Sequence, residues 1–356
     1  MNKIPLFPVK KLTDKQDKRK TELLSNPVSQ ISIKDNGDLT QLVDNFANTS
    51  FQARNLGKAS QLYYKQIRKG NTIIWSLAGS IFSAGLRQIV IDSLNSKLVD
   101  VLVCTGALFE QDMLEALGHH HYICKPEQND GELHELYIDR VYDHLLDELA
   151  LQQVDMTFKE IAKEMPVKHY SSREFMRYCG NWLSKTENIK NSVMQTAYEN
   201  NVPIFIPAIN DSSIGIGIAM QQNENKNTMS IDSIKDLREI ALMKDKAGDT
   251  GIVVIGGGVP KNYSQDAVVM AQMLGYHVNK HKFGIQISTA DVRDGGLSGS
   301  TLKEAISWGK NDKKMKEVMV WGEATVYFPL MMNYVYCKMK NEKRKTRELT
   351  KYFESN

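Results

Sequence analysis

The most regular feature of the chain is a series of short, continuous apolar runs, each ending in small or polar residues. Such runs are typical of strands buried on both faces, because a strand with one solvated face alternates apolar and polar positions. The pattern therefore predicts strands at residues 98–104, 203–208, 251–255, 283–288 and 317–321.

Helical spacing of apolar residues occupies much of the chain between these runs. Strands that alternate with helices long enough for βαβ crossovers favour an α/β fold, a doubly wound, mostly parallel sheet with helices on both faces. Ligands of such sheets bind beyond the carboxyl ends of the strands. Helices are predicted at residues 40–48, 59–69, 110–118, 132–164, 188–200, 231–247, 264–275 and 324–341.

The two ends of the chain differ in composition from its middle. Residues 1–35 are polar and lack a sustained period, which predicts an extension that is either a solvated tail or ordered by a partner subunit. Residues 342–356 are predicted to be a charged tail, and the polar stretch at 220–230 a surface loop. Residues 36–341 are assigned to a single large α/β domain.

Charge and cysteine content argue against several classes of protein. The 45 Lys and Arg nearly balance the 42 Asp and Glu, and no basic stripe suited to nucleic acid is present. No apolar stretch is long enough to cross a bilayer, and the N-terminus does not resemble a secretory signal. We therefore expect no nucleic-acid or membrane partner and a cytoplasmic location. The four cysteines are scattered, without disulfide or metal spacing.

Small and hydroxyl residues follow several of the predicted strands. Glycine allows backbone N–H groups to approach a phosphate or ribose closely. Each group alone is also explained as an ordinary turn, and the GxGxxG fingerprint is absent. Together they predict a nucleotide crevice that also holds a cation. The groups stand at residues 76–87, 104–107, 208–213, 256–258 and 288–299.

The segment Ser307-Trp308-Gly309-Lys310 places an aromatic ring, a glycine and an amine together. A lysine amine is a nucleophile only when deprotonated, and its ordinary pKa is about 10.4. An aromatic wall such as Trp308 can lower that pKa by excluding water, whereas Glu304 favours the charged form and suits the binding of a cationic substrate. The alternative is that Lys310 opens a solvated turn at residues 310–314.

Other motifs do not indicate a chemistry. The consecutive histidines His119, His120 and His121 cannot easily converge on one ion, and no partner stands at zinc spacing, so we predict no metal site. The chain contains neither a GxSxG motif nor a P-loop lysine motif.

An ordered set of motifs over residues 72–332 resembles the deoxyhypusine synthases and their bacterial and archaeal deoxyhypusine synthase-like relatives. The most specific of them is EAISWGK, which ends at Lys310. The others are SIFSAGLR (80–87), VDVLVCTGALFEQD (99–112), FIPAINDSS (205–213), IGGGVPKN (255–262), STAD (288–291), DGGLSGSTLK (294–303) and GEATVYFPL (322–330).

The resemblance implies an NAD-dependent transfer of the aminobutyl group of spermidine. In the family, a lysine captures this group as an imine with loss of diaminopropane, and then passes it to one lysine of the translation factor 5A precursor. The resemblance also implies a homotetramer in which subunits share each site. A small amine acceptor, such as putrescine or agmatine, is the alternative, and a non-catalytic NAD-binding subunit is a second one.

The resemblance also assigns residues to roles. Lys310 is the implied nucleophile, and the ring of Trp308 packs beside it. Glu304 holds a polyamine ammonium. The residues beside the polyamine are Glu110, Gly295, Gly296 and Leu297. The implied NAD contacts are Gly79, Ser80, Ile81, Phe82, Ser83, Thr105, Gly106, Ala107, Gln111, Asp211, Gly257, Thr289, Ala290, Glu323 and Ala324.

This chain departs from the family pattern on the polyamine side. Asn262 stands where the eukaryotic pattern has a histidine that acts as a base, and asparagine cannot take a proton near neutral pH. Ile216 and Leu297 replace two acids, whereas Glu323 in place of Asp is a mild change. Asp266, one helical turn after Asn262, could replace one lost charge. The polyamine donor or the acceptor of the aminobutyl group can therefore differ from that of the eukaryotic enzymes.

Overall fold

A six-stranded sheet forms the centre of the computed structural model, which describes residues 12–32, 37–187, 189, 191–225 and 227–353. Its strands are all parallel, in the order β11-β10-β9-β1-β2-β7. The predicted α/β fold is confirmed. The strands are β1 (Thr72–Leu77), β2 (Val101–Cys104), β7 (Ile204–Phe205), β9 (Thr250–Ile255), β10 (His281–Ser288) and β11 (Asn311–Trp321).

The central strand β1 is absent from the predicted set, although it marks the point where the order of the strands reverses. From β1 the chain extends the sheet through β2 to β7, and it then returns to the other side of β1 to add β9, β10 and β11. The strand order therefore reverses between β1 and β9. In a doubly wound sheet, a crevice opens at this point beyond the carboxyl ends of the strands.

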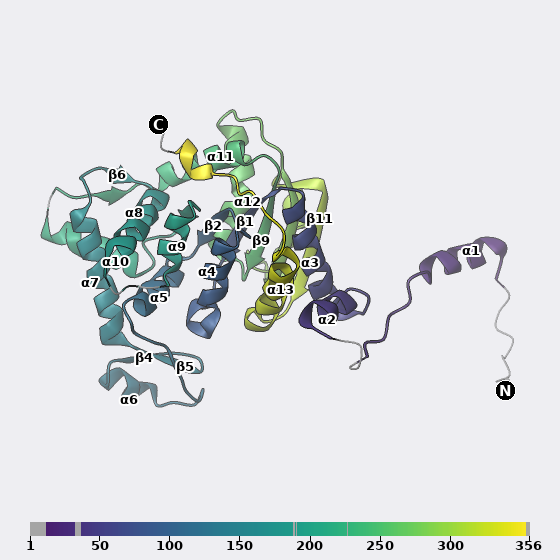
Figure 1. Ribbon diagram of the computed structural model, residues 1–356, viewed down its shortest axis with the longest axis horizontal. Coiled ribbons are helices and arrows are strands. Elements are labelled where there is room, and N and C mark those ends of the chain that lie inside the picture. Colours follow the sequence, from purple (N-terminus) through teal and green to yellow (C-terminus); the bar gives the residue numbers. More distant parts are fainter. Residues whose placement is uncertain (1–11, 33–36, 188, 190, 226, 354–356) are drawn as a thin grey trace.

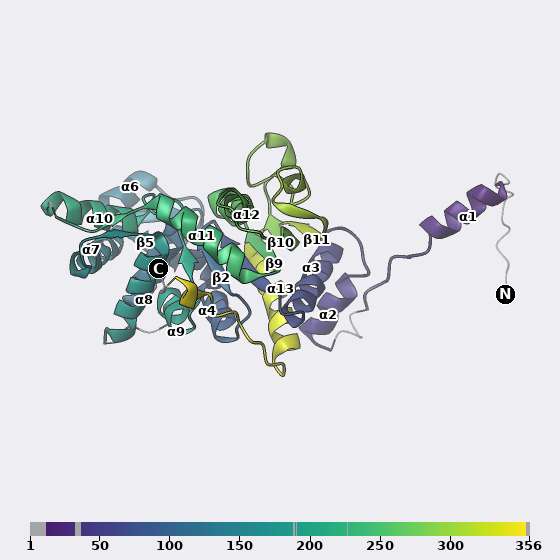
Figure 2. The same ribbon diagram turned by 90° about the horizontal axis from the view of Figure 1, so that it is seen from above.

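Helices cover both faces of the sheet, which explains the continuous apolar runs. Ile74 and Val254 point to the face covered by α11 and α12, where they join one apolar cluster. Trp75 points to the opposite face, where its ring packs edge-on against Phe328 of α13 with centroids 5.4 Å apart. Figures 1 and 2 show α11 and α12 on one side of the strands and α3, α4 and α13 on the other.

Most predicted helices are present, although their ends shift by several residues. The helices α1, α4, α8 and α10 are not among those predicted, and α10 includes the first residues of the predicted surface loop at 220–230. The helices are α1 (Asp14–Leu23), α2 (Leu39–Phe46), α3 (Phe51–Arg68), α4 (Arg87–Asn95), α5 (Gly106–Ala116), α6 (Asp130–Glu135), α7 (Glu148–Glu164), α8 (Ser172–Lys185), α9 (Val193–Glu199), α10 (Ser213–Glu224), α11 (Ser233–Ala247), α12 (Gly258–Met273) and α13 (Ala324–Met339).

The predicted helix at 132–164 is wrong in its first half. There the chain forms α6 and then a hairpin of β4 (Ile138–Val141) and β5 (His144–Asp147), which pairs with β3 (Tyr122–Ile123) in a small antiparallel sheet. Asp147 ends the hairpin and caps α7 by accepting hydrogen bonds from Leu149 N and Ala150 N. A further two-stranded ribbon joins β6 (His169–Tyr170) to β8 (Ser230–Ile231).

The described parts of the two ends behave differently. In the N-terminal extension, α1 is closed by a capping box between Thr13 and Gln16, buries no residue and lies away from the rest of the molecule (Figures 1 and 2). In the C-terminal segment, Arg344 pairs with the buried Asp100 at 2.5 Å, and Leu349 is buried. Residues 1–11, 33–36 and 354–356 lie outside the described residues. No described helix combines the length and the apolar character needed to cross a membrane.

Candidate active site

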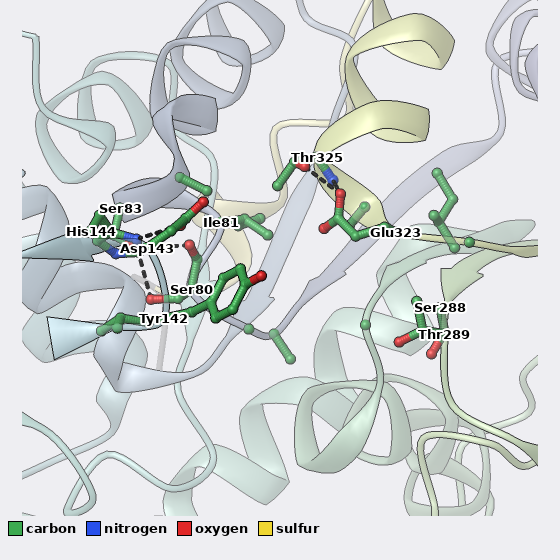
Figure 3. Close-up of a pocket in the computed structure, with 18 of the residues that line it drawn as sticks. Ser80, Ile81, Ser83, Tyr142, Asp143, His144, Ser288, Thr289, Glu323 and Thr325 are labelled. Atoms are coloured by element: carbon green, nitrogen blue, oxygen red, sulfur yellow. Dashed lines mark hydrogen bonds and ion pairs between the residues drawn. The ribbon is translucent and has the colours of Figure 1, made fainter. Parts of the chain in front are cut away.

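A cavity of about 750 Å³ lies where the strand order reverses, beyond the carboxyl ends of β1, β9, β10 and β11 (Figure 3). Its walls contain seven of the residues that the sequence assigns to the cofactor. These are Gly79, Ser80, Ile81, Ser83, Thr289, Glu323 and Ala324. Residues from separate motifs are therefore gathered around one space by the parallel sheet.

Glycines shape the floor of this cavity. Gly79 has φ +85° and Gly256 has φ +77°, a region that favours glycine. A Cβ atom at Gly256 would lie 3.0 Å from the carbonyl oxygen of Ala78, the residue that follows the neighbouring strand β1. Gly257 packs directly against Ser298, whose hydroxyl accepts a hydrogen bond from Gly258 N at 2.9 Å. The backbone at this turn is accessible to a ligand because side chains are excluded.

Gln111 positions the loop at residues 79–83. Its Oε1 accepts a hydrogen bond from Ser83 N at 3.0 Å, and its Nε2 donates to Ser80 Oγ at 2.8 Å. Phe82 points into the core, with its ring centroid 6.4 Å from that of Phe109. Gln111 thus supports the cavity from behind, and Phe82 can meet a ligand only through its backbone.

The predicted residues at the start of α5 form a different environment. Glu110 Oε2 accepts a hydrogen bond from Ser213 N at 3.0 Å. Burial raises the pKa of Glu110, and the charges of Asp155 and Asp211 raise it further. Gly106 packs against Ser212 so closely that no side chain fits. Some of the predicted site residues line neither the cavity of about 750 Å³ nor a second cavity, which surrounds Lys310. These residues are Phe82, Thr105, Gly106, Ala107, Glu110, Gln111, Asp211, Gly257, Ala290 and Gly296.

A separate cavity of about 450 Å³ surrounds Lys310. Lys310 Nζ lies 2.9 Å from Asp266 Oδ1 and donates to Asn262 Oδ1 at 2.7 Å. Asn262 Nδ2 in turn donates to Asp266 Oδ2 at 2.6 Å. The other predicted residues that line this cavity are Gly295, Leu297, Glu304 and Trp308.

These contacts correct the expected environment of Lys310. Trp308 is 68% exposed, and its ring centroid lies 5.6 Å from Lys310 Nζ, a cation–π distance. Both Trp308 and Asp266 therefore stabilise the ammonium, and Trp308 does not exclude water within one chain. Asp266 is also ion-paired with Lys310, a contact that the sequence did not predict.

Two groups of residues were missed in the sequence. Lys261 is fully buried, and its Nζ donates to the carbonyl oxygens of Leu297 at 3.1 Å and Ser300 at 2.5 Å, which fixes the wall of the Lys310 cavity. Burial lowers the pKa of Lys261 to about 8. The tip of the β4–β5 hairpin, residues 141–144, lines the larger cavity. The helix-start signal Asp147-Glu148, inside the predicted helix at 132–164, would have indicated that this helix begins later.

The backbone of Lys310 and the larger cavity lie at opposite ends of β11, because Lys310 immediately precedes this strand and Glu323 follows it. The Lys310 side chain nevertheless contacts Asn262 near the start of α12, the helix that begins two residues after Gly256 of the larger cavity.

No group of three or more His, Cys, Asp or Glu side chains in the described parts of the chain could hold a metal ion. Within the histidine run, His119 contacts Gln153, and His121 pairs with Glu115.

Its fold and larger cavity make this chain a doubly wound α/β protein with a ligand cavity at the switch point of its parallel sheet. The family model for deoxyhypusine synthase matches residues 41–335. The deoxyhypusine synthase-like protein of Chlorobaculum parvum is 45% identical over 338 residues, 94% of this chain and 96% of the relative. That of Coxiella burnetii is 43% identical over 340 residues, with coverage of 94% and 96%.

The chain therefore belongs to the deoxyhypusine synthase family, as the motifs predict. A solved structure of a candidate deoxyhypusine synthase from Entamoeba histolytica shares the fold, with a TM-score of 0.60 and 19% identity over 89% of this chain and 99% of that one. Membership places the chain among transferases of a family that is in general NAD-dependent.

Proposed function

We propose that this protein is a cytoplasmic, NAD-dependent aminobutyltransferase. It takes the aminobutyl group of spermidine onto Lys310 as an imine, with loss of diaminopropane, and passes it to a lysine of the translation factor 5A precursor. The observation that carries the proposal is the position of Lys310, whose amine lies in a cavity between Asn262 and Asp266.

The larger cavity suits NAD by the chemistry of its walls. Hydroxyl groups of Ser80 and Thr289 and the glycine turn at Gly256 can hydrogen-bond a diphosphate and its riboses, and a side chain at Gly256 would narrow the space. Glu323 and Ala324 also line this cavity, and Figure 3 shows Glu323 on the same side as Thr289. NAD bound there would supply a hydride acceptor for an amine carbon and a donor for the product imine.

Asp266 is the proton acceptor for Lys310 in this proposal. Before the amine can attack, its ammonium must lose a proton, and Asp266 Oδ1 lies within hydrogen-bond distance at 2.9 Å. An incoming polyamine ammonium competes for Asp266 and for Glu304 at the rim of the same cavity. This competition loosens the Lys310 ion pair when substrate is present. Asn262 orients both partners but accepts no proton.

The proposed active unit is a homotetramer in which subunits share each site. One observation supports it. Trp308 is largely exposed and leaves one side of the Lys310 cavity open, so a second subunit can complete the enclosure.

A small amine acceptor is the second candidate. Two positions that the family pattern gives to acids carry exposed apolar side chains here, Ile216 and Leu297. Fewer carboxylates weaken the hold on a multiply charged amine. A change of donor or acceptor within the same lysine-imine chemistry accounts for these residues. The non-catalytic alternative leaves the ion-paired Lys310 without a role.

One assay separates these candidates. The protein is incubated with NAD and radiolabelled spermidine, with and without the 5A precursor, and then treated with borohydride. Label on the 5A precursor supports the proposal, and label only in small polyamines supports the second candidate. Wild-type protein without a trapped adduct would contradict both.

A further inference from the structure

The β4–β5 hairpin contributes a wall to the larger cavity that no motif of the family resemblance includes. Val141, Tyr142, Asp143 and His144 all line the cavity. Figure 3 shows Tyr142, Asp143 and His144 on the side opposite Glu323, Ser288 and Thr289. One end of a ligand that extends outward from the glycine turn would therefore contact the hairpin.

The hairpin tip is held in a fixed shape by Arg140. Its guanidinium binds both carboxylate oxygens of Asp130, at 2.6 and 2.7 Å, and donates to the carbonyl oxygen of Tyr142 at 3.0 Å. Tyr142 has φ +53°, a conformation that non-glycine residues rarely adopt, and its side chain is largely exposed. Arg140 is thus committed to the turn, and its charge is neutralised by Asp130.

The wall presents a negative charge without a cation. Among the described residues that line the cavity, Asp143 and Glu323 are carboxylates, and none is Lys or Arg. Burial and the neighbouring His121 lower the pKa of His144, so this imidazole is neutral at pH 7. Its Nδ1 lies 3.7 Å from Asp143 Oδ1, and its Nε2 has no hydrogen-bond partner in the described chain.

NAD and NADP differ at this kind of contact. A ribose hydroxyl donates to a carboxylate, whereas a 2′-phosphate needs a cation such as arginine and is repelled by a carboxylate. We propose that Asp143 at the hairpin tip is a specificity residue that accepts a hydrogen bond from the adenosine ribose of NAD and rejects NADP, with Tyr142 as the aromatic wall beside the base. This inference rests on the proposed function, because it assumes that the cavity holds a nicotinamide dinucleotide.

Calorimetric titration of the purified protein with NAD and with NADP tests the inference without any turnover. We expect wild type to bind NAD at least tenfold more tightly than NADP. Asp143→Asn should reduce this ratio severalfold, and Asp143→Arg should reduce it further by strengthening NADP binding. Asp139→Asn, a change on the same hairpin outside the cavity wall, should leave the ratio at its wild-type value.

The outcomes distinguish two failures. A wild type that binds neither dinucleotide would contradict the proposed function itself. A wild type that prefers NAD, with the same preference in both Asp143 variants, would overturn the role of Asp143 and leave the proposed function intact. Circular dichroism of each variant confirms that the hairpin changes have not unfolded the protein.

Discussion

Lys310, directly before β11, and Asp266, in the third turn of α12, form an ion pair of 2.9 Å. Asn262 bonds to both partners, so the three side chains form one network in the cavity wall. The amine of the proposed nucleophile is therefore held in an ion pair. Its activation in the proposed reaction depends on how the carboxylate responds when substrate enters.

Replacing the carboxylate should slow formation of the lysine adduct. Asp266→Asn keeps the shape but removes both the negative charge and the proton acceptor, so we expect a loss of 10²-fold or more in the rate of the trapped adduct, on the order of a lost general base. NAD affinity should not change, because Asp266 lies outside the larger cavity. Asp245→Asn, which breaks an ion pair with Lys246, is the matched control. An adduct rate equal to wild type would show that Asp266 does not accept the proton.

Restoring an imidazole beside Lys310 should give the site a second base. In Asn262→His we expect faster adduct formation above pH 6.5, because neutral histidine takes a proton that asparagine cannot. The pH profile of the adduct rate should gain a titration near the ordinary histidine pKa of about 6.5. A profile identical to that of wild type would argue that proton transfer to position 262 does not limit the reaction.

The C-terminal segment should stabilise the fold. Asp100 is fully buried, where it accepts from Ile73 N at 2.7 Å and pairs with Arg344. Arg344→Met leaves this carboxylate without its cation, so we expect a loss of about 3–5 kcal/mol in the free energy of unfolding, measured by urea denaturation. The exposed Arg347→Met should change it by less than ~0.5 kcal/mol. If Arg344→Met lowered the free energy of unfolding as little as Arg347→Met, the ion pair between Arg344 and Asp100 would not hold the C-terminal segment.

His281 should make the protein sensitive to mild acid. Burial lowers the pKa of this side chain to about 3, so the folded protein keeps it neutral while the unfolded chain takes up a proton below about pH 6.5. Stability is therefore complete above pH 6.5 and is lost as the pH falls towards 3. From pH 7 to pH 5 the loss due to His281 is about 2 kcal/mol.

The comparison between pH 7 and pH 5 is made on wild type and His281→Asn. The variant should lose correspondingly less stability over this range, whereas the exposed His277→Gln should behave as wild type. Equal acid sensitivity in wild type and His281→Asn would contradict the assignment.

The fold was largely predictable because buried parallel strands leave continuous apolar runs. The failure at residues 138–147 has a physical cause. Ile138, Val141 and Leu145 recur with helical spacing, so the pattern itself favours a helix. The chain turns instead because Tyr142 adopts a left-handed conformation and Arg140 is bound to Asp130, contacts that periodicity does not encode.

The candidate site was predictable only in part. The motifs place Lys310 and Asn262 near the same substrate, but their direct contact joins residues 48 positions apart. The exposure of Trp308 also follows from the fold and not from its neighbours in the sequence. Asp143 and Lys261 were missed because their roles arise from a hairpin tip and a buried cavity wall.

Mass spectrometry of the borohydride-trapped protein shows directly whether Lys310 carries the aminobutyl group. After incubation with NAD and spermidine, we expect a reduced aminobutyl group on the peptide that contains Lys310. We expect no adduct in Lys310→Arg, which should still bind NAD. An adduct on another lysine, or one that persists in Lys310→Arg, would contradict the proposed role of Lys310.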